Sequence, residues 1–212
     1  MVQQARKAVV AVTGGMGSGK SSVAAYLCEI GGAMGLSADA LCRQLLEPGA
    51  AGWLAVRTAF GERFFLADQR IDRPLLRTVL FEDREFRHRL DALLHPLVRD
   101  EIAGCLERES GHTSGKQTRF VVEVPLLYEA GWEHDFSQVV VAYADEKTCL
   151  RRLMLRDRIS EAEAVKAMEA QMPTPERRRS RRYSCRYEKR TAQNWTTSVV
   201  RSPRFESRPI CE

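Results

Sequence analysis

The chain has 212 residues, of which 44% are hydrophobic and 29% are charged, and its formal net charge is +5. This composition is typical of one or two globular domains with a buried core, and it excludes a chain that is disordered throughout. No apolar run reaches the roughly 18–20 residues that a membrane helix needs, so we expect no transmembrane segment.

The first half of the chain predicts a strand, a loop and a helix, followed by a second strand and a helical segment. Residues 9–12 are a β-branched run that enters a glycine cluster, and residues 21–30 follow with apolar side chains at helical spacing. Residues 33–36 are a plausible second strand. From 40 to 108 apolar residues recur three or four positions apart, which predicts a helical segment.

The middle of the chain returns to strands. Residues 120–124 and 139–143 are continuous apolar runs, typical of strands that are covered on both faces of a parallel sheet. Residues 146–155 and 161–170 follow as helices, joined by a charged junction. The alternation predicts an α/β fold, a doubly wound parallel sheet with a helical subdomain inserted in it.

One glycine-rich motif points to nucleotide chemistry. Residues 14–21 match G-x-x-x-x-G-K-[ST] and lie between the first strand and its helix, where main-chain amides can bind phosphate oxygens. We expect Lys20 to bridge the β and γ phosphates and the Ser21 hydroxyl to hold Mg²⁺. The residues expected to bind ATP are Gly14, Gly15, Met16, Gly17, Ser18, Gly19, Lys20, Ser21 and Ser22.

The loop by itself does not separate kinases from other nucleotide-dependent proteins. A GTPase is disfavoured, because the one asparagine, Asn194, is followed by Trp195 and cannot belong to an N-K-x-D motif. A kinase needs a carboxylate to deprotonate the attacking hydroxyl, and Asp39 follows the second strand at the edge where ligands collect. Asp39 could equally cap a helix beginning at Ala40, and the two roles are compatible.

Several motifs in the right order resemble the dephospho-CoA kinase family. Besides the phosphate loop they are A-D-A-L-C-R at 38–43, H-P at 95–96 and V-P-L-L-Y-E at 124–129, and the resemblance covers residues 9 to about 176. It implies transfer of the ATP γ-phosphoryl group to the ribose 3′-hydroxyl of dephospho-CoA, the last step of coenzyme A synthesis. It also implies a P-loop NTPase-type three-layer α/β/α sheet with a helical CoA-binding insertion and a small helical lid.

The resemblance assigns roles to single residues. Asp39 becomes the catalytic base, assisted by Lys20 and by two lid arginines, Arg152 and Arg156, which are four residues apart and so share a helix face. A solvated face with Asp157 as partner is the alternative for these arginines. The residues implied for the acceptor are Asp39, Arg43, Arg73, His95, Pro125, Leu126, Leu127 and Glu129.

Three further candidates have structural alternatives. Arg43 lies one helical turn after Asp39, and the alternative for it is a surface arginine on a solvated face. His95 precedes a proline, so we expect an extended or turn conformation there. A lone histidine in an apolar helical pattern more often packs or caps than contacts a ligand, and this is the alternative to substrate binding. Glu123, at the end of a strand, is a weak candidate for the Mg²⁺ shell beside Ser21, and plain hydration of the strand end is the alternative.

The predicted division of the chain ends in an atypical tail. Residues 8–39 with 117–150 form the nucleotide-binding core, 40–110 the acceptor-binding subdomain and 151–176 the lid. Residues 177–212 carry 11 basic and 3 acidic residues and lack the strand that the family has there. We expect this tail to be disordered or to result from a shifted reading frame, which would expose the neighbouring strand.

Two other functions stay open at this point. One is another P-loop small-molecule kinase, and the other is a nucleotide-gated protein whose basic tail binds nucleic acid, although nucleic acid is an unlikely partner. The expected partners are ATP with Mg²⁺ and dephospho-CoA, and the expected state is a monomer or weak homo-oligomer. Six scattered cysteines without metal spacing, and no secretory signal, favour reduced thiols in the cytoplasm.

Overall fold

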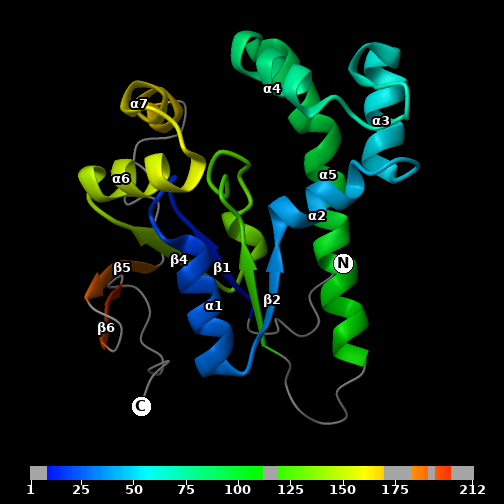
Figure 1. Ribbon diagram of the computed structural model, residues 1–212. Coiled ribbons are helices and arrows are strands. Elements are labelled where there is room, and N and C mark those ends of the chain that lie inside the picture. Colours follow the sequence, from blue (N-terminus) through cyan, green and yellow to red (C-terminus); the bar gives the residue numbers. More distant parts are fainter. Residues whose placement is uncertain (1–8, 112–118, 170–182, 191–193, 202–212) are drawn as a thin grey trace. The chain divides into compact units, whose positions relative to one another are not determined.

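The computed structural model describes residues 9–111, 119–169, 183–190 and 194–201, and the chain divides into two compact units (Figure 1). The first, called here the sheet unit, consists of residues 1–35 and 117–212. The second, the helical unit, consists of residues 36–116. Asp39 lies in the helical unit, whereas it was predicted to belong to the nucleotide-binding core.

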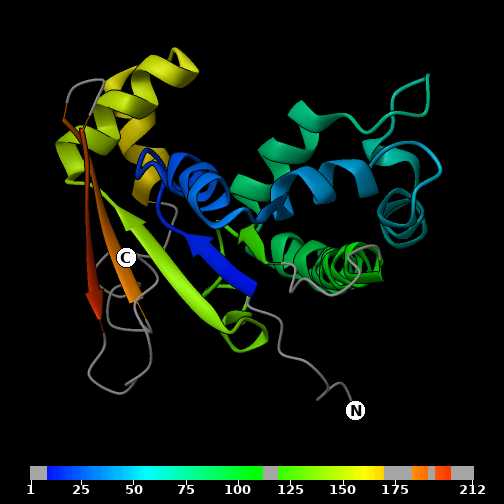
Figure 2. The ribbon, with the colours of Figure 1, turned by 90° about the horizontal axis from the view of Figure 1, so that it is seen from below.

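The strands form a sheet with the order β2-β3-β1-β4-β5-β6, of which β1, β4, β5 and β6 can be followed in Figure 2. β1 pairs in parallel with β3 on one side and with β4 on the other, so that Val10 lies opposite Val121 and Gln138. The strands are β1 (Val9–Thr13), β2 (Met34–Ser37), β3 (Phe120–Glu123), β4 (Gln138–Tyr143), β5 (Tyr183–Arg190) and β6 (Asn194–Arg201).

Helix α1 (Lys20–Gly31) packs against β1, β3 and β4. A small core of Val12, Val23, Val121 and Ala142 fills this contact, and all four side chains are buried. Two further helices follow β4 and pack on each other, α6 (Glu146–Asp157) and α7 (Glu161–Glu169). The strands and helices predicted from hydrophobic spacing are therefore present, and the prediction of a P-loop α/β fold is confirmed.

The tail is where the fold differs from expectation. β5 pairs in parallel with β4, and β6 pairs antiparallel with β5, so the edge of β4 is covered and the prediction of a missing strand is wrong. Backbone hydrogen bonds do not need a long hydrophobic run, and Tyr183 to Tyr187 alternate apolar and polar residues as strands do. The rest of the predicted tail, including 177–182, lies outside the described residues.

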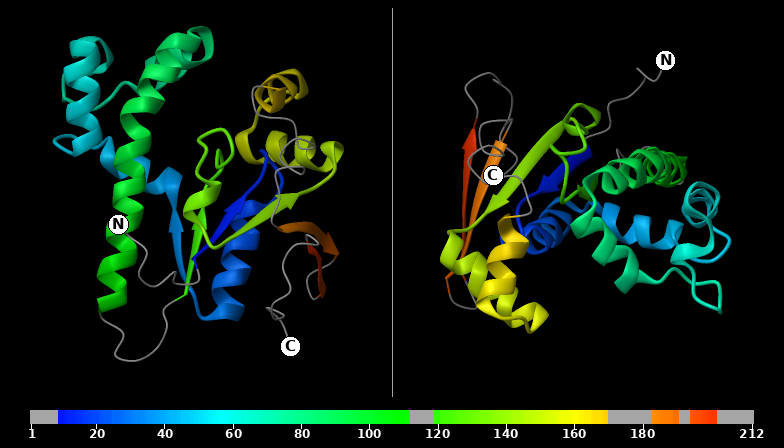
Figure 3. Two further views of the ribbon diagram at one scale, coloured as in Figure 1. Left: turned by 180° about the vertical axis from the view of Figure 1, so that it is seen from behind. Right: turned by 90° about the horizontal axis from the view of Figure 1, so that it is seen from above.

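The described part of the helical unit consists of helices around the long helix α5, as the view from behind shows (Figure 3). α2, α3 and α4 each pack against α5, and Trp53, Val56, Phe64, Phe86 and Leu90 are among the buried residues of their shared core. The elements are α2 (Ala38–Leu45), α3 (Ala51–Phe60), the 3-10 turn η1 (Gly61–Phe64), α4 (Arg73–Glu82) and α5 (Arg84–Gly111).

His95 is helical, which corrects the prediction of an extended or turn conformation. α5 continues through Pro96, although a proline removes one helical hydrogen bond. Leu94, Val98 and Ile102 are buried along the same face, so packing of the helix on its neighbours outweighs the local cost of the proline. None of the helices in the described ranges combines the length and the apolar run needed to span a membrane.

Candidate active site

The phosphate loop connects β1 to α1 as the motif requires. Gly17 and Gly19 have φ angles of 71° and 90°, in the left-handed region where glycine is favoured, and Gly19 is the N-cap of α1. The curled backbone of the phosphate loop places main-chain amides at the N-terminus of α1, where the amides of the first turn have no helical hydrogen-bond partners. This end of α1 is therefore suited to an anion such as a nucleotide phosphate.

Two glycines of the loop are also required by close packing. A Cβ at Gly14 would lie 2.6 Å from the Ser18 hydroxyl and would collide with the Ala142 carbonyl on β4. One at Gly17 would lie 2.8 Å from the Cα of Cys149 on α6. Because real Cβ atoms essentially never come this close, the loop can lie this near β4 and α6 only with glycine at both positions.

Hydroxyl groups on both sides of the loop are buried. Thr13 is completely buried and donates to the Pro125 carbonyl over 3.1 Å, which ties the start of the loop to the segment after β3. Ser18 is 2% exposed, and its hydroxyl makes no hydrogen bond in the described structure. A buried hydroxyl without a partner is uncommon, and at this position a ligand that reaches the loop would supply one.

The two residues predicted for the metal lie together. The Ser21 hydroxyl, on the first turn of α1, donates to the Glu123 carboxylate at the end of β3 over 2.8 Å. Oxygen ligands are what Mg²⁺ prefers, and it usually takes only one or two from the protein beside phosphate and water. Within the described residues no group of three or more His, Cys, Asp or Glu side chains could hold a metal. The pair therefore fits a Mg²⁺ ion that is bound together with a nucleotide.

Helix α6 reaches the loop through an arginine. Arg152 donates from Nη1 to the Gly17 carbonyl over 3.1 Å, so this predicted lid residue contacts the loop itself. The helix begins at an N-cap, Asp145, which accepts from the Thr148 amide over 2.9 Å. The Thr148 hydroxyl and amide lower the pKa of Asp145, which keeps the cap ionised.

Arg156 lies on the exposed side of the same helix. Asp157 accepts two hydrogen bonds from its guanidinium, at 2.6 and 2.8 Å, and this contact raises the pKa of Arg156. Asp157 was the partner expected for Arg156 if the two arginines lay on a solvated face, and the structure has this contact. The two arginines predicted for a lid therefore differ, since Arg152 donates to the phosphate loop and Arg156 to a carboxylate.

In the helical unit, Asp39 lies in the first turn of α2. The N-cap is Ser37, whose hydroxyl accepts from the Ala40 amide over 3.3 Å, so the alternative of Asp39 as the cap is wrong. The helix begins at Ala38 rather than Ala40, which places Asp39 inside its first turn. Asp39 and Arg43 are both exposed and one turn apart, so both can face one ligand.

Three predicted acceptor residues, Asp39, Arg43 and Arg73, lie near the Cys42 thiol, and so does Asp91 of α5. Burial raises the pKa of Cys42, the Asp39 and Asp91 carboxylates raise it further, and Arg73 and Arg43 lower it, so all four charges lie near this side chain. His95 lies one turn after Asp91 on α5, with its Nε2 3.8 Å from the Asp91 carboxylate. The helical unit therefore brings Asp39, Arg43, Arg73 and His95 into one neighbourhood.

The remaining acceptor candidates belong to the sheet unit. Pro125 follows β3, and its carbonyl is held by Thr13. Leu126 is 42% exposed and Glu129 is also exposed, so both side chains reach the surface of the sheet unit. Leu127 is fully buried, so its side chain packs in the core. Only its backbone atoms could contact a ligand.

Four residues that support the candidate site were not predicted from the sequence. Thr13 and Asp145 fix the backbone around the phosphate loop, and Asp91 and Glu47 lie beside the acceptor residues. The N-cap Asp145 was detectable, since it comes directly before a helical pattern. The partners of Thr13 and Glu47 are distant in sequence, and no local pattern reveals such contacts.

A family model and curated relatives match most of the chain. The sequence model of the dephospho-CoA kinase family matches residues 8–188, a range that ends inside β5. Among curated proteins, a dephospho-CoA kinase from Shouchella clausii is 40% identical over 166 residues, which are 77% of this chain and 81% of the relative.

Solved structures agree with the fold. The Thermus thermophilus protein TT1252 has a TM-score of 0.73 at 29% identity, over 89% of this chain and 91% of the other. A dephospho-CoA kinase from Campylobacter jejuni has a TM-score of 0.57 at 22% identity, over 86% of this chain and 89% of the other. At that identity the second likeness shows the fold alone.

Proposed function

The chain belongs to the dephospho-CoA kinase family, and from this premise we propose the reaction and the role of each residue. It is a kinase that uses ATP. The proposed reaction transfers the γ-phosphoryl group of ATP to the 3′-hydroxyl of the ribose of dephospho-CoA, and the products are CoA and ADP.

The nucleotide half of the site is the phosphate loop. Amides of residues 14–19 and the Lys20 ammonium bind the phosphates, and Ser21 with Glu123 holds Mg²⁺ when the nucleotide is present. When bound, the metal neutralises charge on the phosphate oxygens. Arg152 keeps the Gly17 turn in place, and Arg156 exchanges Asp157 for phosphate oxygens in the transition state.

The acceptor half is carried by the helical unit. Asp39 accepts the proton of the 3′-hydroxyl while the hydroxyl oxygen forms a bond to the γ-phosphorus and the bond to ADP breaks. Arg43 and Arg73 bind the anionic groups of dephospho-CoA, for which a planar guanidinium is better suited than an ammonium. His95 and the exposed residues Leu126 and Glu129 complete the proposed contacts.

The observation that carries this proposal is the neighbourhood of Cys42. An exposed carboxylate, Asp39, lies in it together with two guanidinium groups, Arg43 and Arg73. A general base that works on a phosphorylated alcohol needs this combination, because cations must hold the acceptor's phosphates while the carboxylate takes the hydroxyl proton.

The test is ADP release from ATP and Mg²⁺ by the full chain, with and without dephospho-CoA. We expect ADP only when the acceptor is present, and CoA as its product by mass spectrometry. ADP with another hydroxyl acceptor but none with dephospho-CoA would contradict the proposed acceptor. Ser21→Ala should raise the Mg²⁺ concentration needed for half-maximal rate, because the metal loses one of its oxygen ligands.

The cytoplasm is the proposed location, because free thiols stay reduced there. A monomer or weak homo-oligomer is the proposed state, and sedimentation velocity at several protein concentrations tests it. A stable oligomer at the lowest concentration would contradict it.

A further inference from the structure

We propose that Glu47 is a positioning residue for the acceptor: it holds the Arg73 guanidinium in the orientation that binds a phosphate of dephospho-CoA. The inference rests on the proposed function, in which Arg73 contacts the acceptor. No motif assigns a role to Glu47, and the contact that suggests one joins two segments that are 26 residues apart.

The contact is an ion pair with one point of attachment. Arg73 donates from Nη2 to the Glu47 carboxylate over 3.1 Å, and the two side chains are 49% and 59% exposed. A guanidinium has five N–H donors, so this single contact leaves donors free for a phosphate. An exposed arginine without such a contact would lose side-chain conformational entropy when it binds a ligand. Because the ion pair with Glu47 already restricts the Arg73 side chain, less entropy is lost on binding.

Both partners extend from a fixed backbone. The Glu47 amide donates to the Gln44 carbonyl over 3.1 Å, and the Glu47 carbonyl accepts from the Ala50 amide over 3.0 Å, so the turn after α2 is closed on both sides of this residue. The backbone from which the Glu47 side chain extends is therefore fixed by hydrogen bonds.

Arg73 is fixed by the start of α4. It is the first residue of that helix, and the preceding Asp72 is the N-cap, whose carboxylate accepts from the Leu75 amide over 3.0 Å. The Asp72 amide in turn donates to the Phe64 carbonyl over 2.8 Å. The position of the Arg73 backbone thus depends on η1 and α4, and only the direction of its side chain is left to Glu47.

The surrounding charges explain why the direction matters. Asp39 and Asp91 lie in the same neighbourhood, around Cys42, as Arg73. A guanidinium without its own carboxylate would be attracted to these two, and a pair with Asp39 would occupy the proposed base. Pairing with Glu47 keeps Arg73 oriented and leaves the Asp39 carboxylate for the hydroxyl proton.

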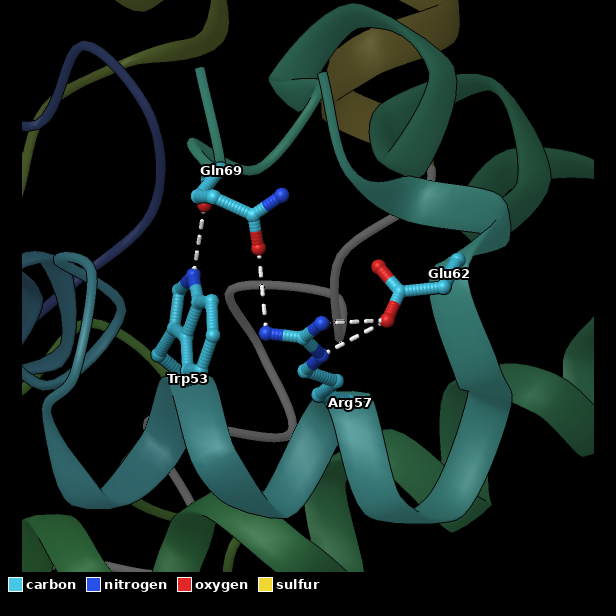
Figure 4. A network of polar contacts seen from close by, with 4 residues as sticks. All are labelled: Trp53, Arg57, Glu62 and Gln69. Carbon is cyan, nitrogen blue, oxygen red and sulfur yellow. Dashed lines mark hydrogen bonds and ion pairs between the residues drawn. The ribbon is translucent and has the colours of Figure 1, made fainter. Parts of the chain in front are cut away.

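The same unit offers a matched control. Arg57 donates from Nε to the Glu62 carboxylate over 2.7 Å and from Nη1 to the side-chain oxygen of Gln69 over 3.0 Å (Figure 4). The backbone carbonyl of Gln69 accepts from the Trp53 indole. The side chains of this pair are 39% and 63% exposed, similar to those of Arg73 and Glu47. Glu62→Gln therefore removes a comparable ion pair that does not contact Arg73.

The experiment is steady-state kinetics on the full chain with each substrate varied in turn, for wild type, Glu47→Gln, Glu47→Asp and Glu62→Gln. We expect Glu47→Gln to raise KM for dephospho-CoA about 3- to 10-fold. kcat should stay within about two-fold, and KM for ATP should not change. Glu47→Asp, which keeps the carboxylate, should lie closer to wild type, and Glu62→Gln should match wild type.

Three results would overturn the inference. An unchanged KM for dephospho-CoA in Glu47→Gln would mean that Arg73 needs no support, and a lower KM would mean that Glu47 competes with the acceptor for Arg73. In an Arg73→Met background Glu47→Gln should have no further effect, and an equal loss there would also contradict the role.

Binding of dephospho-CoA, measured by titration calorimetry, separates this inference from the proposed function. If the wild type binds dephospho-CoA without turning it over and Glu47→Gln binds it more weakly, the positioning role stands and the proposed reaction fails. If the wild type neither binds nor converts dephospho-CoA, both fail.

Discussion

Replacing Gly17 by alanine tests whether the phosphate loop is held against helix α6. The new methyl group would lie 2.8 and 2.9 Å from the Cα and carbonyl carbon of Cys149, which are backbone atoms of a buried helical residue. Neither can move without shifting α6. The φ angle of 71° adds a second cost, because residues with a Cβ are strained in the left-handed region.

The magnitude follows from these two costs. Left-handed backbone costs about 1–2 kcal/mol for a residue with a side chain. Forcing a methyl group into a packed contact costs about 1–3 kcal/mol more. Gly17→Ala should therefore lower the free energy of unfolding by about 2–5 kcal/mol. It should also raise KM for ATP, because the loop backbone must shift to accept the methyl group.

Gly131→Ala is the matched control in the same unit. Gly131 has a φ angle of 69°, and a Cβ there would meet nothing within 4 Å. Its cost is the backbone cost alone, about 1–2 kcal/mol. Urea denaturation of both variants, followed by circular dichroism, measures the difference. Equal losses of stability would refute the contact between the loop and α6.

Three further changes test single contacts. Ser37→Ala should lower the free energy of unfolding by about 0.5–2 kcal/mol through loss of the α2 N-cap, and Ser37→Asn should restore most of it in the same urea titration. Thr13→Val should cost about 0.5–1.5 kcal/mol, because the Pro125 carbonyl loses its donor; no loss by thermal melting would contradict that contact. The lowered pKa of Asp145 means that its contribution to stability is present above its unfolded value of about 3.9 and is lost as pH falls through the lower folded value. Below about pH 4 wild type should therefore lose more stability than Asp145→Asn, and parallel acid-unfolding curves would contradict this.

Local signals in the sequence were sufficient for the nucleotide half of the site. The strand, the glycines and the lysine of the phosphate loop are adjacent in sequence, and their chemistry follows from backbone conformation alone. The approach of Ser21 to Glu123 could also be expected, because parallel neighbouring strands end at the same edge of a sheet.

Other features depend on contacts that local patterns do not record. Pro96 predicts a break, but the buried face of α5 continues the helix through it. Tyr183 to Tyr187 have a two-residue alternation that the many surrounding arginines conceal, and the open edge of β4 supplies the partner strand. The pair of Glu47 and Arg73 joins two helix boundaries whose proximity only the tertiary structure determines.

The central claim is that Asp39 is the base of an acceptor-dependent kinase, and Asp39→Asn tests it most directly. The variant keeps the size of the side chain and the Ser37 cap, so α2 should remain folded. ADP release with ATP, Mg²⁺ and dephospho-CoA should fall about 10²- to 10⁴-fold in kcat, the usual contribution of a general base, with KM for ATP within about two-fold of wild type. A kcat close to that of the wild type would contradict the claim.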